Sequence, residues 1–380
     1  MNSKNGQYLI NLEKLDIVFL CEKIKEERDE SMKKAGIITI YGDYENYGNR
    51  LQNYAVQECL KKLNLDSFTI KYMHIGAEEE ASTIDYNLDR LAAFKDFNDN
   101  IKFYDEKIYV DRETPEGYGN DLDYVCIGSD QIWNYNFRRI FSRKAFADFM
   151  PKEKKMAFSA SIGVSNAPDK DTEDYKIFAE NLNELKAISV REEAAKDIIK
   201  EISGRDDVKV VLDPTMIVTR EDWEKVIKRP KQLKTDNYIV KCFLGTVEPE
   251  KEAAIQKFAK ENGCEVIDVM SEDSEYFGIG PAEFVYLEKN AKLVATDSFH
   301  SSVFAIIFDT PFVVFQRSDN KLKSMHSRIE TLLGTFKLEH RIFENEITDD
   351  MFRQEDNEVA QKILAEKRKD AMDYFKTVLV

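Results

Sequence analysis

The chain has 380 residues, of which 43% are hydrophobic and 33% are charged, a composition typical of a globular protein large enough for two domains. Its formal net charge of −16 argues against nucleic acid as a partner, because phosphate binding requires a basic face. No apolar run approaches the roughly 20 residues that span a bilayer, and the first residues lack the order of a signal peptide, so a cytoplasmic protein is expected.

The first part of the chain is predicted to be a helical extension followed by a parallel α/β sheet. Residues 1–35 are polar and helix-prone, and the regular pattern begins at Gly36. Short β-rich runs then alternate with helical stretches, such as residues 49–63, and this alternation is the mark of a parallel sheet. The runs predicted as strands are residues 35–42, 67–73, 123–130, 155–163, 187–192 and 208–215.

A second α/β series follows a charged bridge near residues 228–236. Helices are predicted at residues 248–263 and 299–308, and a charged amphipathic helix at about 355–378 ends the chain. The predicted strands are residues 237–245, 264–270, 292–298 and 311–316. We therefore expect two Rossmann-like domains with a cleft between them at the carboxyl ends of the strands. The predicted boundaries are 1–35 for the extension, 36–226 and 227–345 for the domains, and 346–380 for a helix that packs back on the first domain.

The five cysteines are scattered, and no two have the CxxC spacing of a zinc or redox site. Each lies in or beside an apolar segment, as reduced thiols in or near a core do. No His–Cys cluster accompanies them, so neither a disulfide nor a metal site is expected. The residues are Cys21, Cys59, Cys126, Cys242 and Cys264.

The stretch "DSFHSSVF" at residues 297–304 places His300 among hydroxyls, where a predicted strand passes into a helix. The first turn of that helix offers free backbone N–H groups and the positive end of the helix dipole, and Ser298, Ser301 and Ser302 add hydroxyl donors. Together these groups predict an anion site. The dipole disfavours a charged imidazole, so His300 is expected to be neutral near pH 7. The alternative is a helix cap with a satisfied histidine.

An earlier loop, like the segment around His300, directly follows a predicted strand. It carries Asp43, Asn46, Gly48 and Asn49, and a helix follows. Gly48 and Asn49 could adopt positive φ and bring the backbone close to a ligand. The loop is neither a GxGxxG fingerprint nor a P-loop, and an ordinary βα turn is the alternative.

Three further clusters lie at strand ends or at a helix start. Asp130 and Gln131 end one strand, and Arg191 ends another, where a guanidinium group can bind a carboxylate or phosphate. Arg328 lies in the first turn of a helix predicted within residues 323–333. A surface ion pair with an adjacent glutamate is the alternative for Arg191, and an exposed position is the alternative for Arg328. No Ser–His–Asp order can be identified. The five clusters fall at matching points of the topology, which favours one shared site.

In their order and spacing, these segments resemble the polysaccharide pyruvyl transferase family. The likeness runs from about Gly36 to about Ile342. Many members carry Gly or Ala directly after the histidine, where this chain has Ser301. The segments are "YGNRLQNYAVQ", "DYVCIGSDQIWN", "SASIG", "ISVREE", "VLDPTMI", "TDSFHSSVFAIIFDTPFVVF" and "HSRIETLL".

The resemblance implies two Rossmann-like domains arranged as in GT-B glycosyltransferases, the first on the acceptor side and the second on the donor side. It also implies phosphoenolpyruvate as the donor and a product that holds pyruvate as a cyclic ketal on two sugar hydroxyls, with release of phosphate. The acceptor would be a bacterial capsule or exopolysaccharide, or its lipid-linked precursor, which would bring the protein to the inner face of the membrane. Neither a cofactor nor a metal is required.

On this interpretation, His300 and Arg191 are catalytic. The groups expected to bind the donor are Arg191, Arg328, Ser298, His300, Ser301 and Ser302. Those expected to bind the acceptor are Asp43, Asn46, Gly48, Asn49, Asp130 and Gln131. Two alternatives stay open at this point. One is a GT-B glycosyltransferase that uses a nucleotide sugar, and the other is a non-catalytic glycan-binding scaffold.

Overall fold

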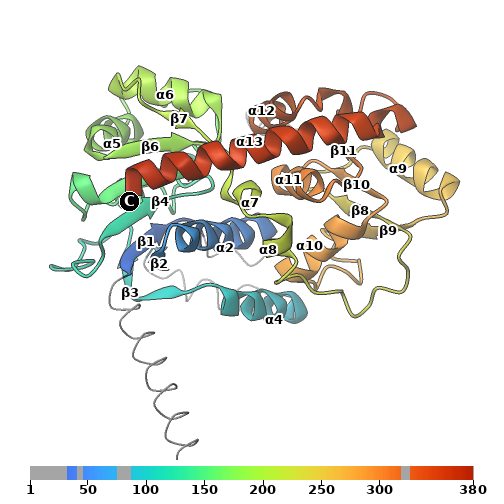
Figure 1. Cartoon of the computed structure of the whole chain (residues 1–380), viewed down its shortest axis with the longest axis horizontal. Helices are drawn as coiled ribbons and strands as arrows, with labels where there is room; N and C mark the ends of the chain where they lie inside the picture. The colour runs from blue at the N-terminus through green and yellow to red at the C-terminus, as the bar shows by residue number, and fades with distance from the viewer. Residues whose placement is uncertain (1–31, 41–45, 75–86, 318–325, 380) are drawn as a thin grey trace, which may run out of the picture.

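The computed structural model describes residues 32–40, 46–74, 87–317 and 326–379 (Figure 1). Within these residues the strands form a seven-stranded sheet in the order β3-β2-β1-β4-β5-β6-β7 and a four-stranded sheet in the order β11-β10-β8-β9. All neighbouring strands are parallel. The predicted fold class, α/β with two Rossmann-like sheets, is confirmed. The predicted extension lies outside the described residues up to residue 31.

The first sheet lies in the left half of Figure 1. Its strands are β1 (Lys33–Ile38), β2 (Leu65–Met73), β3 (Phe103–Tyr109), β4 (Tyr124–Ile127), β5 (Lys155–Ala160), β6 (Ala187–Val190) and β7 (Lys209–Val210). The helices of this part are α2 (Tyr47–Lys62), α4 (Leu88–Phe97), α5 (Glu173–Asn181), α6 (Glu193–Ser203), α7 (Pro214–Ile217) and α8 (Arg220–Trp223). Strand β3 was not predicted, because it is an edge strand with mostly exposed or half-buried residues and lacks the apolar run of a central parallel strand.

The second sheet lies in the right half of Figure 1. Its strands are β8 (Tyr238–Cys242), β9 (Glu265–Asp268), β10 (Leu293–Thr296) and β11 (Phe312–Val314). Its helices are α9 (Pro249–Glu261), α10 (Pro281–Asn290), α11 (Phe299–Phe308) and α12 (His326–Phe336). The first sheet ends at Val210 and the second begins at Tyr238, so the predicted boundary at residue 226 falls between them. The boundaries themselves and the cleft stay predictions.

One cluster of buried apolar side chains runs through both halves of the molecule. Tyr47 of α2 stacks on Phe284 of α10 with ring centroids 4.3 Å apart, and its hydroxyl accepts a hydrogen bond of 2.7 Å from Arg90 of α4. Trp223 of α8 packs edge-on against Phe304 of α11 at 5.0 Å. Aromatic pairs of this kind add to the apolar area that they bury. Because the two halves share this core, the carboxyl ends of β1 and β10 have fixed positions relative to each other.

The last helix, α13 (Gln354–Leu379), crosses both halves (Figure 1). Its Gln361 donates a hydrogen bond to the carbonyl of Ile306 in α11. Farther along, Arg368 donates to the carbonyl of Met216 in α7. Near its end the Phe375 ring stacks on Phe158 of β5, with centroids 3.7 Å apart. The helix therefore ties the second half of the molecule to the first sheet.

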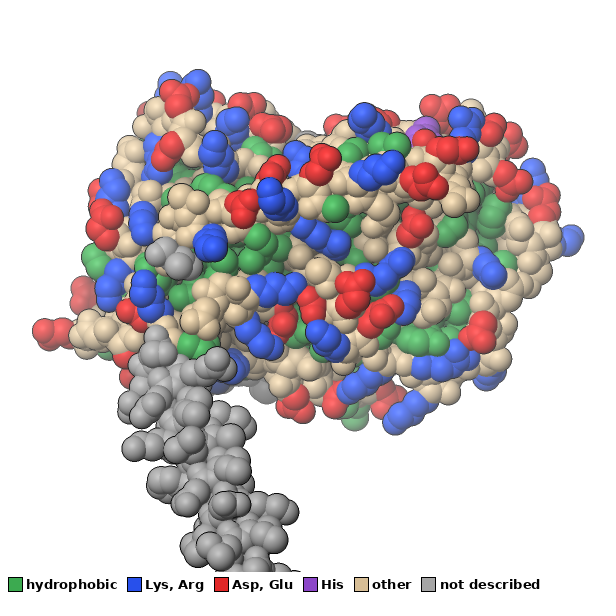
Figure 2. Space-filling view, viewed as in Figure 1, with side chains coloured by type: hydrophobic (Ala, Val, Ile, Leu, Met, Phe, Trp, Pro, Cys, Tyr) green, Lys and Arg blue, Asp and Glu red, His purple; other side chains and the backbone are tan. Residues whose placement is uncertain are grey.

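The surface carries acidic and basic side chains interspersed over the face shown in Figure 2. In the described ranges, no helix is both long enough and apolar enough to cross a membrane. The cysteines in these ranges are free thiols: Cys59, Cys126 and Cys242 are buried and Cys264 is half-buried, in agreement with the prediction of reduced thiols. Cys21 lies outside the described residues.

Candidate functional site

His300 lies in the first turn of α11, directly after the carboxyl end of β10. The apolar strand buries all four of its residues, and the chain turns at Ser298, the extended residue that precedes the helix. The Ser298 N–H donates to Thr296 Oγ1 at 2.9 Å, which fixes the turn. The His300 side chain is 12% exposed, and its Nε2 is buried without a hydrogen-bond partner in the described part of the chain. The prediction of a histidine at a helix start is therefore confirmed.

Asp213 faces the His300 ring across the site. Its Oδ2 lies 4.0 Å from His300 Nε2. Its Oδ1 caps α7 by accepting hydrogen bonds from the backbone N–H and the hydroxyl of Thr215, at 3.0 and 2.6 Å. Burial raises the pKa of Asp213, but the charges of Arg191 and His300 outweigh this and lower the pKa below its ordinary value. Asp213 is therefore a fixed, ionised carboxylate.

Arg191 follows β6 and is surrounded by carboxylates. Its Nη1 donates to Asp213 Oδ2 at 2.6 Å and its Nη2 to Asp130 Oδ1 at 2.8 Å, while Nε lies 3.8 Å from Glu192 Oε2. Burial acts to lower the pKa of Arg191, but these carboxylates outweigh it and raise the pKa. The surface ion pair considered from the sequence is thus wrong, because the side chain is only 1% exposed.

Arg328 reaches the same place from α12. Its guanidinium lies 5.8 Å from the Phe299 ring centroid, and that of Arg191 lies 4.8 Å from it. Arg328 is only 6% exposed, and among the described residues its Nε has no hydrogen-bond partner. Burial, and after it the charge of Arg191, lowers the pKa of Arg328 to about 10. A buried guanidinium with an unsatisfied donor is suited to bind an anion.

The first turn of α2 meets His300, but not in the way predicted for the loop before it. Asp43 lies outside the described residues. Asn46 caps α2 by accepting the Asn49 N–H at 3.3 Å. Gly48 lies within the helix and does not have a positive φ, so the predicted reason for a glycine there is wrong. Gly48 instead leaves room for the ring, because a Cβ at this position would stand 2.1 Å from His300 Nδ1.

Asp130 and Gln131 are engaged within the protein. The Asp130 carboxylate binds Arg191, as described. The Gln131 Oε1 accepts a hydrogen bond of 2.8 Å from Asn134 and packs against Gly163, where a Cβ would stand 2.1 Å from it. Both side chains are therefore committed to partners inside the first half of the molecule.

The serines of α11 also face the protein. Ser302 donates a hydrogen bond of 3.0 Å to the carbonyl of Ser298, within the first turn. Ser301 donates one of 2.6 Å to Oε1 of Glu288 in α10. Both serines are fully buried, whereas the Ser298 side chain makes no capping hydrogen bond. The hydroxyls of Ser301 and Ser302 are thus committed to partners inside the fold.

The model of the polysaccharide pyruvyl transferase family matches residues 46–319. The chain belongs to this family. A search of curated proteins finds no match.

Solved structures with a similar course of the chain include UDP-N-acetylglucosamine 2-epimerase from Rickettsia bellii, at 14% identity and a TM-score of 0.43, with 90% of this chain and 97% of that one covered. The UDP-GlcNAc 2-epimerase from Neisseria meningitidis bound to UDP-GlcNAc is 13% identical, with a TM-score of 0.46 and coverage of 88% and 99%. The glycosyltransferase SnogD from Streptomyces nogalater is 10% identical, with a TM-score of 0.47 and coverage of 92% and 100%.

Membership of the pyruvyl transferase family implies a transferase that acts on a polysaccharide. The matched range contains His300, Asp213 and Arg191, whereas Arg328 lies beyond its end. The resemblance to this family is therefore confirmed. Ser301, the residue at which the chain departs from the usual Gly or Ala, is hydrogen-bonded to the buried Glu288.

Two acidic groups of this transferase escaped the sequence analysis. Asp213 could have been found, because an Asp-Pro pair at a strand end is a sign of a helix cap with Pro at the first helical position. Asp297 is bound by the backbone N–H groups of Leu244 and Gly245 and by Arg317 at 2.8 Å. No local pattern pairs Asp297 with Arg317, because the two residues meet only when β10 and β11 align.

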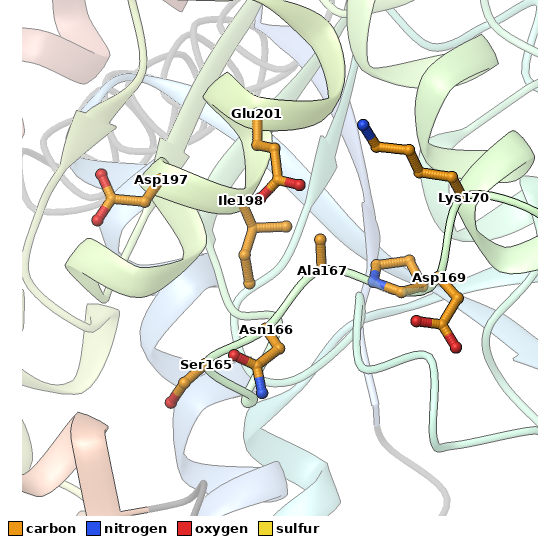
Figure 3. A pocket seen from close by; sticks show the side chains of 9 residues that line it. Ser165, Asn166, Ala167, Asp169, Lys170, Asp197, Ile198 and Glu201 are labelled. Atoms are coloured by element: carbon orange, nitrogen blue, oxygen red, sulfur yellow. The ribbon is translucent and has the colours of Figure 1, made fainter.

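A hollow of about 430 Å³ lies apart from these residues, between the loop of residues 165–170 and α6 (Figure 3). None of the predicted site residues of this family member lines it. In the ranges that the structure describes, no three His, Cys, Asp or Glu side chains are grouped to hold a metal ion.

Proposed function

We propose that this chain transfers the pyruvyl unit of phosphoenolpyruvate to two hydroxyls of a sugar, in a polysaccharide or its lipid-linked precursor, with formation of a cyclic ketal and release of phosphate. The observation that carries the proposal is His300, whose Nε2 is buried beside Asp213 without a hydrogen bond to any described residue, at the start of a helix and near Arg328. This combination of groups is suited to proton transfer next to an anionic donor.

The chemistry needs one proton carrier. His300 takes up a hydroxyl proton and passes it to the methylene carbon of phosphoenolpyruvate, which turns C2 into an oxocarbenium-like electrophile. One sugar hydroxyl attacks C2, the C2–O bond to phosphate breaks, and the second hydroxyl closes the ring. Of the two hydroxyl protons, one ends on the methyl carbon and the other on the departing phosphate. Burial lowers the pKa of His300 even though Asp213 and Asp130 act to raise it, so the ring is ready to accept a hydroxyl proton near pH 7.

The donor anion is proposed to bind at Arg328 and the start of α11. Arg191 and Arg317 are paired with buried aspartates, whereas no carboxylate lies within ion-pair distance of Arg328 in the described part of the chain. The first N–H groups of the ten-residue helix α11 have no partner within the helix and could add hydrogen bonds to the same anion. A donor carboxylate or phosphate would meet the unsatisfied Arg328 Nε.

The acceptor is proposed to bind on the side of α2. Gly48 packs against the His300 ring, so a sugar hydroxyl bound near Asn46 and Asn49 would lie within reach of the proton carrier. Asp130 and Gln131 have hydrogen-bond partners inside the protein, so the acceptor is proposed to bind at Asn46 and Asn49.

The test is a measurement of phosphate release from phosphoenolpyruvate by the purified full chain, with a panel of sugar and lipid-linked sugar acceptors. Mass spectrometry of the acceptor should show the gain of a pyruvyl group. Thermal protection by uridine or guanosine nucleotides, but not by phosphoenolpyruvate, would instead indicate a glycosyltransferase. Glycan binding without phosphate release would indicate a scaffold.

Replacing Arg328 by alanine is expected to raise KM for phosphoenolpyruvate about 10- to 100-fold, with a smaller change in kcat. The reason is the loss of a charge-assisted contact of about 1.5–3 kcal/mol to the donor. Steady-state kinetics with varied donor checks this, and Arg328→Lys, which keeps the charge, should lose less. An unchanged KM for the donor in Arg328→Ala would place the anion elsewhere.

Replacing Gly48 by alanine is expected to lower kcat about tenfold, because the new methyl group would displace the His300 ring from its place near Asp213. The fold should persist, since alanine favours a helix by about 1 kcal/mol over glycine. The matched control is Gly334→Ala in α12, where the nearest atom to a Cβ lies at 3.6 Å. Both variants are compared by kcat and thermal unfolding, and equal turnover in the two would contradict the proposed ring position.

A further inference from the structure

We infer that Asp213 is a positioning residue for His300: it holds the ring so that Nε2 carries the proton and Nδ1 is the atom that exchanges protons with the substrate, while Arg191 fixes Asp213 instead of binding the donor. The role of Asp213 in catalysis rests on the proposed function, whereas its contacts with His300 and Arg191 are independent of that function. It replaces the donor-binding role predicted for Arg191.

The two nitrogens of the His300 ring have different surroundings. Nε2 is buried, has no hydrogen-bond partner among the described residues and lies 4.0 Å from Asp213 Oδ2. Nδ1 lies on the side of Gly48, at the start of α2. An ionised carboxylate can only accept, so a proton on Nε2 is favoured and the lone pair is left on Nδ1. The reacting nitrogen then faces the proposed acceptor side.

Asp213 is held too firmly to turn away from the ring. Its Oδ1 accepts two hydrogen bonds from Thr215, and its Oδ2 accepts one from Arg191 at 2.6 Å and one from Ser129 at 3.3 Å. These donors come from three separate elements, so the carboxylate orientation does not depend on bound substrate.

The Arg191 guanidinium is already surrounded by carboxylates, although its Nε has no hydrogen-bond partner among the described residues. Three carboxylates, those of Asp213, Asp130 and Glu192, lie within 3.8 Å of its nitrogens, and the Phe299 ring lies 4.8 Å from its guanidinium carbon. One guanidinium against three carboxylates leaves a surplus of negative charge, which would repel a further anion. Arg191 therefore acts on His300 through Asp213.

Charges from four places face the ring. Asp213, before α7, and Asp130, after β4, act to raise the pKa of His300, and Arg191, after β6, and Arg328, in α12, act to lower it. Burial is the largest cause and sets the net direction downward. Loss of the Asp213 charge should therefore lower the pKa of His300 further, whereas loss of the Arg191 charge should raise it.

The first test is NMR of the full chain with isotopically labelled histidine, in which the four histidines are separated by the signal lost in His300→Gln. The wild-type ring should be neutral at pH 7 and protonated on Nε2. In Asp213→Asn the new amide can donate to Nε2, so the Nδ1-protonated form should increase and the pKa should fall. A wild-type ring protonated on Nδ1, or an Asp213→Asn variant with an unchanged ring, would overturn the inference.

Arg191→Gln is the opposing variant, and the pKa of His300 should rise in it. Because this change leaves three buried carboxylates without their cation, Arg191→Lys is made beside it and should keep the pKa near that of the wild type. Asp297→Asn is the matched control, a buried aspartate that is paired with Arg317, and it should leave the pKa of His300 in place. If Arg191→Gln fails to fold, the inference is tested by the His300 pKa in Asp213→Asn, compared with that in the Asp297→Asn control.

The second test is the pH profile of phosphate release. Asp213→Asn should lower kcat about tenfold with little change in KM for phosphoenolpyruvate, and the acid limb of kcat/KM should move to lower pH. In Arg191→Gln the acid limb should move to higher pH. A rise in KM for the donor like that of Arg328→Ala would show that Arg191 binds the donor, against the inference. Absence of phosphate release by the wild type would overturn the proposed function alone, since the NMR result still decides the role of Asp213.

Discussion

Replacing His300 by alanine is expected to lower the turnover of pyruvyl transfer by about 10²-fold or more, while the chain stays folded. The imidazole is the titratable group at the start of α11, and loss of a positioned proton carrier has an effect of this size. The fold should persist because His300 Nε2 makes no hydrogen bond among the described residues and the ring is not part of the apolar clusters. Steady-state phosphate release and thermal unfolding measure the two effects.

His340 offers a matched control for this substitution. It pairs with an aspartate as well, since its Nε2 lies 3.2 Å from Asp356 Oδ2, but its side chain is 39% exposed and lies near the end of the second half. His340→Ala should keep the turnover of the wild type. Near-full activity in His300→Ala, or unfolding of that variant, would make His300 a structural cap and remove the centre of the mechanism.

Replacing Glu288 by glutamine is expected to abolish the pH dependence that this residue gives to stability. Glu288 is fully buried in α10, and its Oε2 has no hydrogen-bond partner in the described ranges. Burial raises its pKa from 4.5 to about 8, although the Ser301 hydrogen bond acts to lower it. The folded state thus holds the proton more tightly than the unfolded state does.

The sign follows from this difference in proton binding. The stabilisation by protonated Glu288 is complete below pH 4.5 and is lost as the pH rises through about 8. The loss is about 1.4 kcal/mol for each pH unit between 4.5 and about 8, on the order of 5 kcal/mol in all. Urea unfolding at pH 5, 7 and 9 should therefore show Glu288→Gln gaining stability relative to the wild type with rising pH. An equal difference at pH 5 and pH 9 would contradict the buried, protonated carboxyl.

Ser301→Ala separates the hydrogen bond from the buried carboxyl. Alanine is a residue that many family members carry after the histidine, but here it would leave Glu288 without its donor, at a cost of about 1–3 kcal/mol. In the background of Glu288→Leu, which has no polar group to satisfy, the same change should cost less. A double-mutant cycle from urea unfolding gives the coupling between the two positions.

The local pattern of residues was enough to predict the two-sheet fold and the place of His300. Helix α11 has the bounds expected from residues 299–308, and α13 differs by one residue at each end from the predicted 355–378. These features were predictable because their signals are local in the sequence. The periodicity of a strand or helix, and the change from apolar to polar residues where a strand ends, involve residues only a few positions apart. Strand β3 was missed because half-buried edge strands lack that apolar run.

The partners of the polar side chains were decided by the tertiary structure alone. Arg191 meets Asp130 across 61 positions of sequence, and the Gly48 backbone meets the His300 ring across the two halves of the molecule. The sequence by itself determined that a histidine, arginines and hydroxyls would lie at strand ends and helix starts. It could not tell which arginine would be paired with buried carboxylates and which would have none within ion-pair distance in the described ranges, or that Ser301 would face Glu288. Those outcomes depend on the packing of α7, α10, α11 and α12, because a buried polar group takes whichever partner the packing brings within hydrogen-bond distance.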